Sequence, residues 1–529
     1  LDPTLPPTPV VQVTSTPDSF PPAVFQLQQV AIADLHSTGL PVQEVDYLAI
    51  GGGLGSFTWV DLLRIGGVLP AQVLVLGMEP QPYARYQRLC QNSQIPAHER
   101  LRSNSDSCPD NIWGFPSYAW REAWHDLRQG KLVNACAYLW QVFTEPILAE
   151  TYTPRSGNVF ASIDREANRI GWAQMFTYGR VRALRKTQDG RYVAAYSRST
   201  SHRRDHALAI ARYVHLAIGY PAIQFLPDLQ AYRQQTQDFY TVVNAYEQHE
   251  HVYDHLTQHG GTVVLRGRGI VASRIIQRLH ELRHRNPNIQ VVHLMRSPKV
   301  RGNRFGNSQR PVRHHQEFQP FNWPKACWGG DLRVLLEKAT PEQRQQLLTT
   351  WGGTTTADRR DWQRILQEGL RSGWYQIQFG DVETVTAELL PDGRRQTLSI
   401  LRSHSDLPPQ PLRADFIIDA TGLDAKVTAN PFLNDLVTHY NLPLNYLGRL
   451  TVANDFELTE LRNQRGRVYA AGATTLGGPY AAVDSFLGLQ YAALQSVTSL
   501  AAAHAAGLHP LTWQRSLSQW WKWVLNQSP

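Results

Sequence analysis

The chain has 529 residues, of which 42% are hydrophobic and 18% charged, so it falls in the globular range and is long enough for two or three domains. Its formal charge of +8 suits anionic ligands, but basic runs interleaved with aromatic residues are absent, and nucleic acid is not expected as a partner. No apolar run reaches the roughly 18 residues of a membrane span, and no signal peptide is visible. The four cysteines are scattered without a CxxC pair, which predicts a cytoplasmic protein with no metal site.

The first predicted elements surround a glycine-rich turn. Residues 1–22 are rich in Pro, Thr and Ser, and residues 1–44 are interpreted as a linker or extension. The apolar run Val45–Ile50 predicts a buried strand, and Phe57–Ile65 predicts a helix. Between them lies a turn whose candidate cofactor-binding residues are Gly51, Gly52, Gly53, Gly55 and Ser56.

A second turn of the same kind lies about two hundred residues further on. It follows the strand Thr262–Leu265 and reads Gly267-Arg268-Gly269-Ile270-Val271-Ala272, with Gly267, Gly269 and Ala272 as candidate binding residues. In such a turn the first glycine permits a tight bend and the second lets backbone N–H groups approach a pyrophosphate. The small third residue packs helix on strand, and the helix N-terminus attracts phosphate. Two such turns predict two dinucleotides, and hence a flavin reduced by a nicotinamide.

Between the turns the pattern alternates between strands and aromatic segments. Ala71–Leu76 predicts a second buried strand, and Glu79 after it is either a ribose-binding carboxylate or a solvated loop residue. Residues 97–175 are rich in Trp, Tyr and Phe, and such clusters are more often core or domain interface than substrate site. Within them Trp113–Trp120 is the candidate for a wall that keeps water from a flavin.

An internal duplication is indicated by two similar arrangements. Gly179–Ser199 predicts a hairpin turning at Asp189-Gly190, and a strand at Tyr213–Ala217 leads to Gly219. Later, Asp381–Leu390 leads to a turn at Asp392-Gly393, and Phe416–Asp419 leads to Gly422.

The predicted strand Gln290–Met295 ends in a basic and hydroxyl-bearing cluster. Arg296, Ser297 and Lys299 stand where NAD-binding units place an acidic residue. A 2′-phosphate is dianionic and matches guanidinium, so NADPH is favoured over NADH; the alternative is an ordinary solvated basic loop.

The end of the chain holds a glycine turn and a tryptophan-rich helix. Gly472 ends a short strand, and Ser485–Ala501 predicts a helix. Trp513–Leu525 contains four tryptophans. Packing on this protein or on a partner is favoured for it over lying on a membrane surface, because its charge is low for an interfacial helix.

Together these features resemble the two-dinucleotide-binding-domain flavoproteins (FAD/NAD(P)H oxidoreductases), and most closely the class B and N-hydroxylating flavin monooxygenases. The resemblance implies an α/β fold with two Rossmann-like domains, an FAD domain with an inserted NAD(P)H domain, each with a small antiparallel β-meander. The expected divisions are 45–235 (first part of the FAD domain), 236–415 (NADP domain with an aromatic insertion) and 416–529 (second part of the FAD domain and C-terminal helix). The chain departs from the family at Ala473, where aspartate is usual, and at Ile218 and Arg268.

The resemblance implies an FAD-dependent, NADPH-utilising monooxygenase that acts through a flavin peroxide on a small nucleophilic substrate. The hard chemistry would belong to the cofactor, so no side chain is assigned a catalytic role. One alternative is a reductase that passes electrons to a quinone or protein acceptor. Another is a non-catalytic scaffold or partner-binding subunit, which the departures at Ala473, Ile218 and Arg268 would suit.

Overall fold

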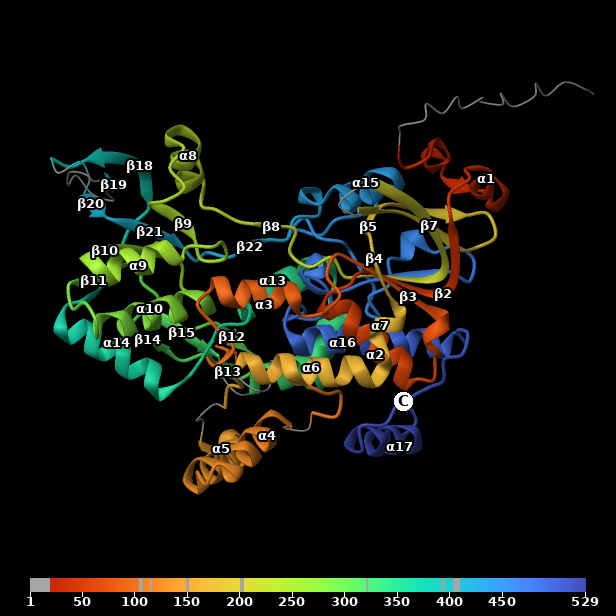
Figure 1. The fold of residues 1–529 in the computed structure, drawn as a ribbon, viewed down its shortest axis with the longest axis horizontal. Helices are drawn as coiled ribbons and strands as arrows, with labels where there is room; N and C mark the ends of the chain where they lie inside the picture. The colour runs from red at the N-terminus through yellow and green to blue at the C-terminus, as the bar shows by residue number, and fades with distance from the viewer. Residues whose placement is uncertain are drawn as a thin grey trace, which may run out of the picture.

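The computed structural model describes residues 20–103, 108–114, 117–148, 152–199, 204–319, 322–391, 393, 395–402 and 410–529. Most of the Pro-rich stretch, residues 115–116 of the aromatic segment and Asp392 of the second hairpin turn lie outside these ranges. The chain forms two α/β units, each built on its own sheet (Figure 1). Across the described ranges, no helix is long and apolar enough to cross a membrane.

The first unit is built on five parallel strands in the order β23-β7-β2-β3-β4. They are β2 (Val42–Gly51), β3 (Val73–Gly77), β4 (Phe176–Tyr178), β7 (Arg204–Leu216) and β23 (Arg467–Ala470). Alternate residues of β2 enter different cores: Tyr47 and Ala49 face one layer of helices, and Leu48 and Ile50 face the other side. Burial on both faces explains the continuous apolar run in the sequence.

The second unit has the same plan, with five parallel strands in the order β9-β21-β10-β11-β17. They are β9 (Val242–Asn244), β10 (Gly261–Arg266), β11 (Ile289–Met295), β17 (Tyr375–Phe379) and β21 (Phe416–Asp419). Each unit also carries an antiparallel meander, which extends the first sheet and forms a separate sheet in the second unit. The meander strands are β5 (Arg180–Thr187) and β6 (Tyr192–Ser199) with β7, and β18 (Val382–Leu389), β19 (Arg395–Leu401) and β20 (Gln410–Ala414).

The predicted fold class and the duplication are therefore confirmed. The long strand β7 joins both the meander and the parallel sheet of the first unit, and β20 followed by β21 does the same in the second. The expected border at residue 415 is wrong by one strand, because β21 pairs with β10 and β9 of the second sheet. The chain crosses between the units at β8 (Ala222–Ile223) and returns at β22 (Leu423–Asp424), and these two segments pair antiparallel.

Helices cover the sheets of both units (Figure 1). Those of the first unit are α2 (Leu54–Ile65), α3 (Ala84–Asn92), α4 (Ser117–Arg128), α5 (Leu132–Leu148), α6 (Ser156–Ile170), α7 (Trp172–Met175), α15 (Pro431–Tyr440), α16 (Phe486–Ala502) and α17 (Trp513–Val524). Those of the second are α8 (Pro227–Thr236), α9 (Glu250–His259), α10 (Ile270–Arg283) and α14 (Arg360–Ser372).

The aromatic insertion of the second unit packs back on the first. It contains β12 (Arg304–Phe305), β13 (Ser308–Gln309), β14 (Val312–Arg313), β15 (Gln316–Gln319), α11 (Asn322–Gly329), α12 (Asp331–Lys338), α13 (Pro341–Trp351) and β16 (Thr356–Ala357). Trp323 and Trp351 are buried in a core of the first unit, and Trp328 contacts Tyr491 of α16 edge-on. These tryptophans therefore hold the two units together.

The described end of the N-terminal segment is also folded. Residues 20–41 contain β1 (Gln29–Val30) and α1 (Ile32–Ser37), and β1 pairs with β5. Phe25, Val30 and Leu35 are buried against the meander of the first unit. This part of the expected extension is thus an integral layer of the first unit.

The turn after β2 and the turn after β10 pack in the same way. Gly51 and Gly267 have positive φ angles of 129° and 119°, which L side chains rarely adopt. A Cβ on Gly51 would lie 2.2 Å from the carbonyl oxygen of Ala217, and a Cβ on Gly267 would lie 2.4 Å from that of Ala420. The first glycine of each turn is therefore required by the neighbouring strand, β7 or β21, as well as by the bend.

Candidate functional site

The first candidate site is the N-terminus of α2 at the carboxyl edge of the first sheet. Gly53 is the N-cap residue of α2. A Cβ on Gly53 would meet nothing in the described chain nearer than the Pro82 carbonyl oxygen at 4.0 Å. Gly219, just beyond β7, has a positive φ, and a Cβ there would meet no described atom within 4 Å. Open space over a helix N-terminus is what a pyrophosphate needs.

The other predicted residues of the first turn serve packing. Gly52 lies against Gly77 of β3, where a Cβ would come within 2.7 Å of the Gly77 Cα atom. A Cβ on Gly55 would lie 2.9 Å from that of Ala217, so this glycine lets α2 approach β7. Ser56 is fully buried, and its hydroxyl has no hydrogen-bond partner in the described part of the chain.

Glu79 and Gly472 lie at the same edge of the first sheet. Glu79 follows β3, as a ribose-binding residue would, but its carboxylate accepts from Arg88 Nη2 at 2.7 Å. Gly472 follows β23 with a φ of 77°, and a Cβ there would come within 3.2 Å of Leu489. Ala473, where the family has aspartate, is buried.

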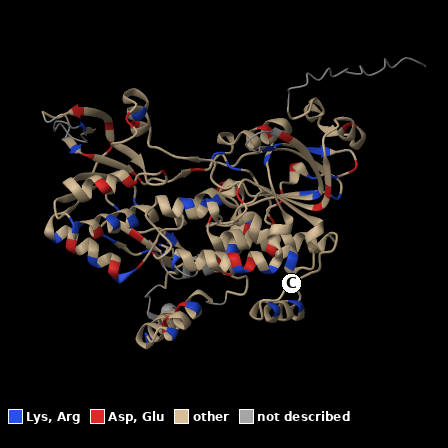
Figure 2. Ribbon diagram, viewed as in Figure 1, with Lys and Arg blue, Asp and Glu red and all other residues tan. Residues whose placement is uncertain are grey.

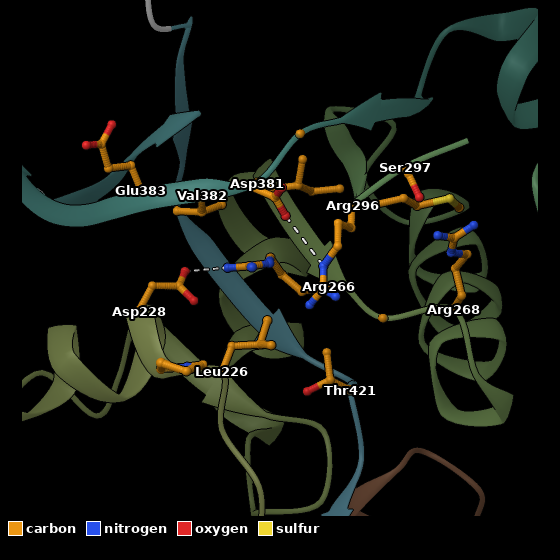
Figure 3. Close-up of a pocket in the computed structure, with 15 residues that line it drawn as sticks. Leu226, Asp228, Arg266, Arg268, Arg296, Ser297, Asp381, Val382, Glu383 and Thr421 are labelled. Carbon is orange, nitrogen blue, oxygen red and sulfur yellow. Dashed lines mark hydrogen bonds and ion pairs between the residues drawn. The ribbon is translucent and has the colours of Figure 1, made fainter. Parts of the chain in front are cut away.

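The second candidate site is a cavity of about 730 Å³ at the carboxyl edge of the second sheet. Figure 3 shows that its lining side chains come from the ends of several strands, with Arg266 and Arg296 pointing toward the centre. The lining includes Gly267, Arg268, Arg296, Ser297 and Thr421. A Cβ on Gly269, the N-cap residue of α10, would meet no described atom within 4 Å, and the same holds for Gly422. Ala272 is buried, as expected for the small third residue.

Positive and negative charges are balanced in this cavity. Three arginines (Arg266, Arg268, Arg296) and three acids (Asp228, Asp381, Glu383) line it. Asp228 accepts from Arg266 at 2.5 Å, and Asp381 lies 3.4 Å from Arg296 (Figure 3). Arg296 is 78% exposed, so it is free to turn toward a ligand.

Lys299 does not join the other residues of the predicted basic cluster. Its ammonium lies 3.1 Å from the Glu317 carboxylate and donates to Asn303 at 2.7 Å, and it is not part of the cavity lining. Arg268 does line the cavity, and its Nη1 donates to the carbonyl oxygen of His315 at 3.4 Å. The cation beside the second turn is therefore Arg268 rather than Lys299.

His293 anchors the second turn from below. It is fully buried on β11, and its Nε2 bonds the carbonyl oxygen of Gly267. Because a carbonyl only accepts, Nε2 carries the proton and Nδ1 accepts from Tyr375 Oη at 2.8 Å. Burial lowers the pKa of His293 to about 4, so the imidazole is neutral at physiological pH.

Asp419 organises the other side of the second cavity. It is fully buried at the end of β21, and its carboxylate accepts from the backbone N–H groups of Leu226 and Thr421. Burial raises its pKa, although these hydrogen bonds and nearby Arg266 act in the opposite direction. The sequence analysis did not identify Asp419, Gly77 or His293 as functional residues. A signal was present for each, because each is a glycine or a polar residue within an otherwise apolar strand.

The aromatic segment expected to form a flavin-side wall lies elsewhere. Trp113 contacts the ring of Trp523 at 5.7 Å and donates to Ser516 Oγ at 3.1 Å, both on α17. Trp120 is exposed on α4, beside Trp124. Trp113 therefore packs on α17, and Trp120 is exposed to solvent, so a water-excluding role for Trp113–Trp120 stays a prediction.

Comparison with solved structures finds the same architecture in hydroxylases and a monooxygenase. The ornithine hydroxylase of Pseudomonas aeruginosa is 15% identical, with 86% of this chain and 98% of that chain covered and a TM-score of 0.58. The cadaverine monooxygenase of Erwinia amylovora is 12% identical, with 89% and 96% covered and a TM-score of 0.60. The ornithine N-hydroxylase of Kutzneria sp. 744 is 15% identical, with 86% and 98% covered and a TM-score of 0.58.

No protein-family model matches the sequence, and no curated protein sequence matches it. The structural likeness nevertheless spans nearly the whole of the three similar proteins. The chain therefore has the fold of the two-dinucleotide-binding-domain flavoproteins.

Gly53 and Gly269, which occupy equivalent positions in the two turns, offer a selective test of the two sites. Gly53 and Gly269 have φ angles of −92° and −82°, which any residue adopts, so Gly53→Val and Gly269→Val should fold. We expect Gly53→Val to lose flavin, measured by visible absorbance, while it still binds NADPH in a calorimetric titration. Gly269→Val should show the reverse. Full flavin occupancy in Gly53→Val would contradict the assignment.

Gly51→Ala is the matched contrast, because there the new Cβ meets protein rather than open space. It should lower the free energy of unfolding by roughly 2–4 kcal/mol, from the strained backbone and the overpacking together. This is measured by urea denaturation.

Burial of His293 predicts a pH dependence of stability. The unfolded imidazole has a pKa near 6.5 and the folded one about 4, so unfolding takes up a proton between these values. The contribution is complete above pH 6.5 and is lost as the pH falls toward 4. We expect about 2 kcal/mol of this loss between pH 7 and pH 5.

His293→Gln keeps a donor for the Gly267 carbonyl oxygen but does not titrate. Urea denaturation at several pH values should therefore show a shallower dependence in this variant. An unchanged slope would show that His293 is not the titrating group.

Proposed function

We propose that the protein is an FAD-dependent, NADPH-utilising monooxygenase that acts on a small nucleophilic substrate, with a terminal amine as the substrate class. The observation that carries the proposal is the paired glycine turns, Gly51–Gly53 and Gly267–Gly269. Gly51 and Gly267 pack on the neighbouring strand, and Gly53 and Gly269, two residues later in each turn, face open space. One such turn suits one dinucleotide, and the duplicated plan suits two.

The structural likeness supports the choice of chemistry. The Erwinia protein is a cadaverine monooxygenase solved with FAD, and the Kutzneria protein is an ornithine N-hydroxylase solved with reduced FAD, NADP⁺ and L-ornithine. All three similar proteins act on compounds with a terminal amine, which is why we infer that class here. When bound, the flavin would take electrons from NADPH and react with oxygen.

The residues of this chain would bind and orient the two cofactors. Gly53 and Gly219 would leave room for the FAD pyrophosphate at the N-terminus of α2. Gly269 would leave room for the NADPH pyrophosphate at α10, with Arg268 as the cation beside it. The paired segments β8 and β22 begin just beyond Gly219 and Gly422, so they tie the carboxyl edges of the two sheets to one junction. That placement suits transfer from one cofactor to the other.

The junction between the units is closed by direct contacts. Asn92 at the end of α3 donates to the Tyr246 carbonyl oxygen at 2.8 Å, and Ser93 Oγ donates to that of Ala245 at 3.3 Å. Burial raises the pKa of Tyr246 to about 12, with Asp484 acting in the same direction, so its hydroxyl stays neutral. A junction of this kind supports the exclusion of water that a monooxygenase needs.

The preference for NADPH over NADH is proposed to rest on Arg296 and Ser297. Removing the guanidinium in Arg296→Ala should raise the Kd for NADPH about tenfold and leave that for NADH nearly unchanged, because only NADPH has the 2′-phosphate. Asp381→Asn should tighten NADPH binding, since Asp381 competes for Arg296. Both are measured by calorimetric titration.

Lys299→Ala is the matched control, because Glu317 and Asn303 already hold this ammonium. It should leave the ratio of the two Kd values within about twofold. Equal weakening of NADPH and NADH by Arg296→Ala would show that the cluster does not bind the 2′-phosphate.

The reaction is tested with the purified full-length protein loaded with FAD. Addition of ornithine, lysine or cadaverine should accelerate NADPH oxidation, consume oxygen and yield the hydroxylated amine, identified by mass spectrometry. One oxygen atom enters the amine and the other leaves as water. Fast quinone reduction without any hydroxylated amine would instead support the reductase. Failure to bind either cofactor would support the scaffold.

A further inference from the structure

Two separate elements of the first unit present apolar side chains outward along the same edge of the molecule. These are α17 and the hairpin of α4 and α5, which both lie at the lower edge in Figure 1. Trp113, just before α4, connects them through its contacts with Trp523 and Ser516 of α17. We name the exposed apolar residues of α17 and the hairpin the lower apolar surface.

The apolar stripe of α17 faces away from the protein. Trp513, Leu517 and Trp521 follow one another at four-residue spacing and are 74%, 57% and 58% exposed. The opposite side of the helix is fixed, because Trp523 and Gln519 are buried against the first unit. The chain after the helix is fixed too: Arg169 Nη1 donates to the Gln527 carbonyl oxygen at 3.2 Å, and Arg165 Nε donates to Asn526 at 3.0 Å.

The hairpin carries a second group of exposed apolar side chains. On α4 they are Trp120, Trp124 and Leu127, spaced so that they share one side of the helix. On α5 they are Leu132, Val133, Trp140 and Phe143. An apolar surface of this extent on two elements is expected to have an occupant.

The charges around the lower apolar surface identify the occupant. Residues 485–529 contain no Asp or Glu, and α17 carries Arg515 and Lys522. In the hairpin Glu122 and Asp126 are buried, whereas Arg128 and Lys131 are exposed. Between Ser117 and Thr144 every exposed charged side chain is therefore cationic. Figure 2 marks where basic and acidic residues lie along the ribbon of the hairpin and α17.

We propose that the lower apolar surface binds the face of a lipid bilayer that contains anionic phospholipid. Tryptophan and aliphatic side chains partition into the headgroup region, and lysine and arginine at the rim attract anionic headgroups. A second copy of the chain fits less well. An isologous contact would bring Arg128, Lys131 and Lys522 of one copy toward those of the other, and the hairpin residues of described burial supply no exposed carboxylate to pair with them.

Vesicle flotation of the full-length protein tests the proposal. The protein should float with vesicles of phosphatidylcholine and phosphatidylglycerol, float much less with phosphatidylcholine alone, and be released by high salt. The double variant Leu517→Ser, Trp521→Ser should reduce the floated fraction about tenfold, because it removes two apolar side chains from the contact. Trp120→Ser, Trp124→Ser should also reduce it.

The matched control is Leu389→Ser, Val300→Ser, which removes two exposed apolar side chains from the second unit. It should float like the unaltered protein, and circular dichroism and thermal unfolding should show that all variants are folded. Equal flotation of the Leu517, Trp521 variant and this control would overturn the proposal, as would failure to float with anionic vesicles. A dimer in sedimentation experiments that dissociates in the Leu517, Trp521 variant would also overturn it, in favour of an interface between copies.

Discussion

The structure depends on the close approach of two glycines to carbonyl groups of a neighbouring strand. The turn after β2 reaches the chain beyond β7 at Ala217, and the turn after β10 reaches the chain beyond β21 at Ala420. A Cβ at either glycine would force the turn away from that strand, and the following helix would move with it. The position of α2 and α10, and thus of the N–H groups at their first turns, is set by these two contacts. Everything proposed for cofactor binding follows from that placement.

The parts of the fold that the sequence predicted are those with a strong local signal. Strands β3, β10 and β11 and the second half of β2 are largely buried on both faces, so they are short continuous apolar runs, and glycines with positive φ follow β2 and β10 directly. The border at residue 415 was misplaced for a physical reason. In the first unit one strand, β7, belongs to both the meander and the parallel sheet, whereas in the second unit two strands, β20 and β21, share these places. A single apolar run such as Phe416–Asp419 does not reveal which strand it pairs with.

The composition of the second cavity was only partly predictable, because its charges come from distant segments. Arg296 and Ser297 follow one strand and are visible together. Asp228 lies in the first turn of α8 and Asp381 follows β17, and only the folded sheet brings them beside the arginines. Lys299 is the opposite case. It is close to Arg296 in the sequence, but its ion pair with Glu317 of β15 keeps it out of the cavity lining. The sequence around Arg296 therefore suggests a more positive cavity than the structure has, because the acidic lining residues come from other segments.

The direction in which an aromatic helix faces is also set outside the helix itself. The periodicity of Trp513–Val524 is equally compatible with its tryptophans packing inward and with their facing outward. The contact between Trp523 and Trp113 determines which side of the helix faces the protein. Neither α17 nor the α4–α5 hairpin has a counterpart among the duplicated strands and helices, so neither is needed to complete a sheet. Exposed tryptophans cost solubility and gain the fold nothing in return. Their exposure on both elements, at one edge and beside the exposed cations Arg128 and Lys131, is best explained by a surface that they bind.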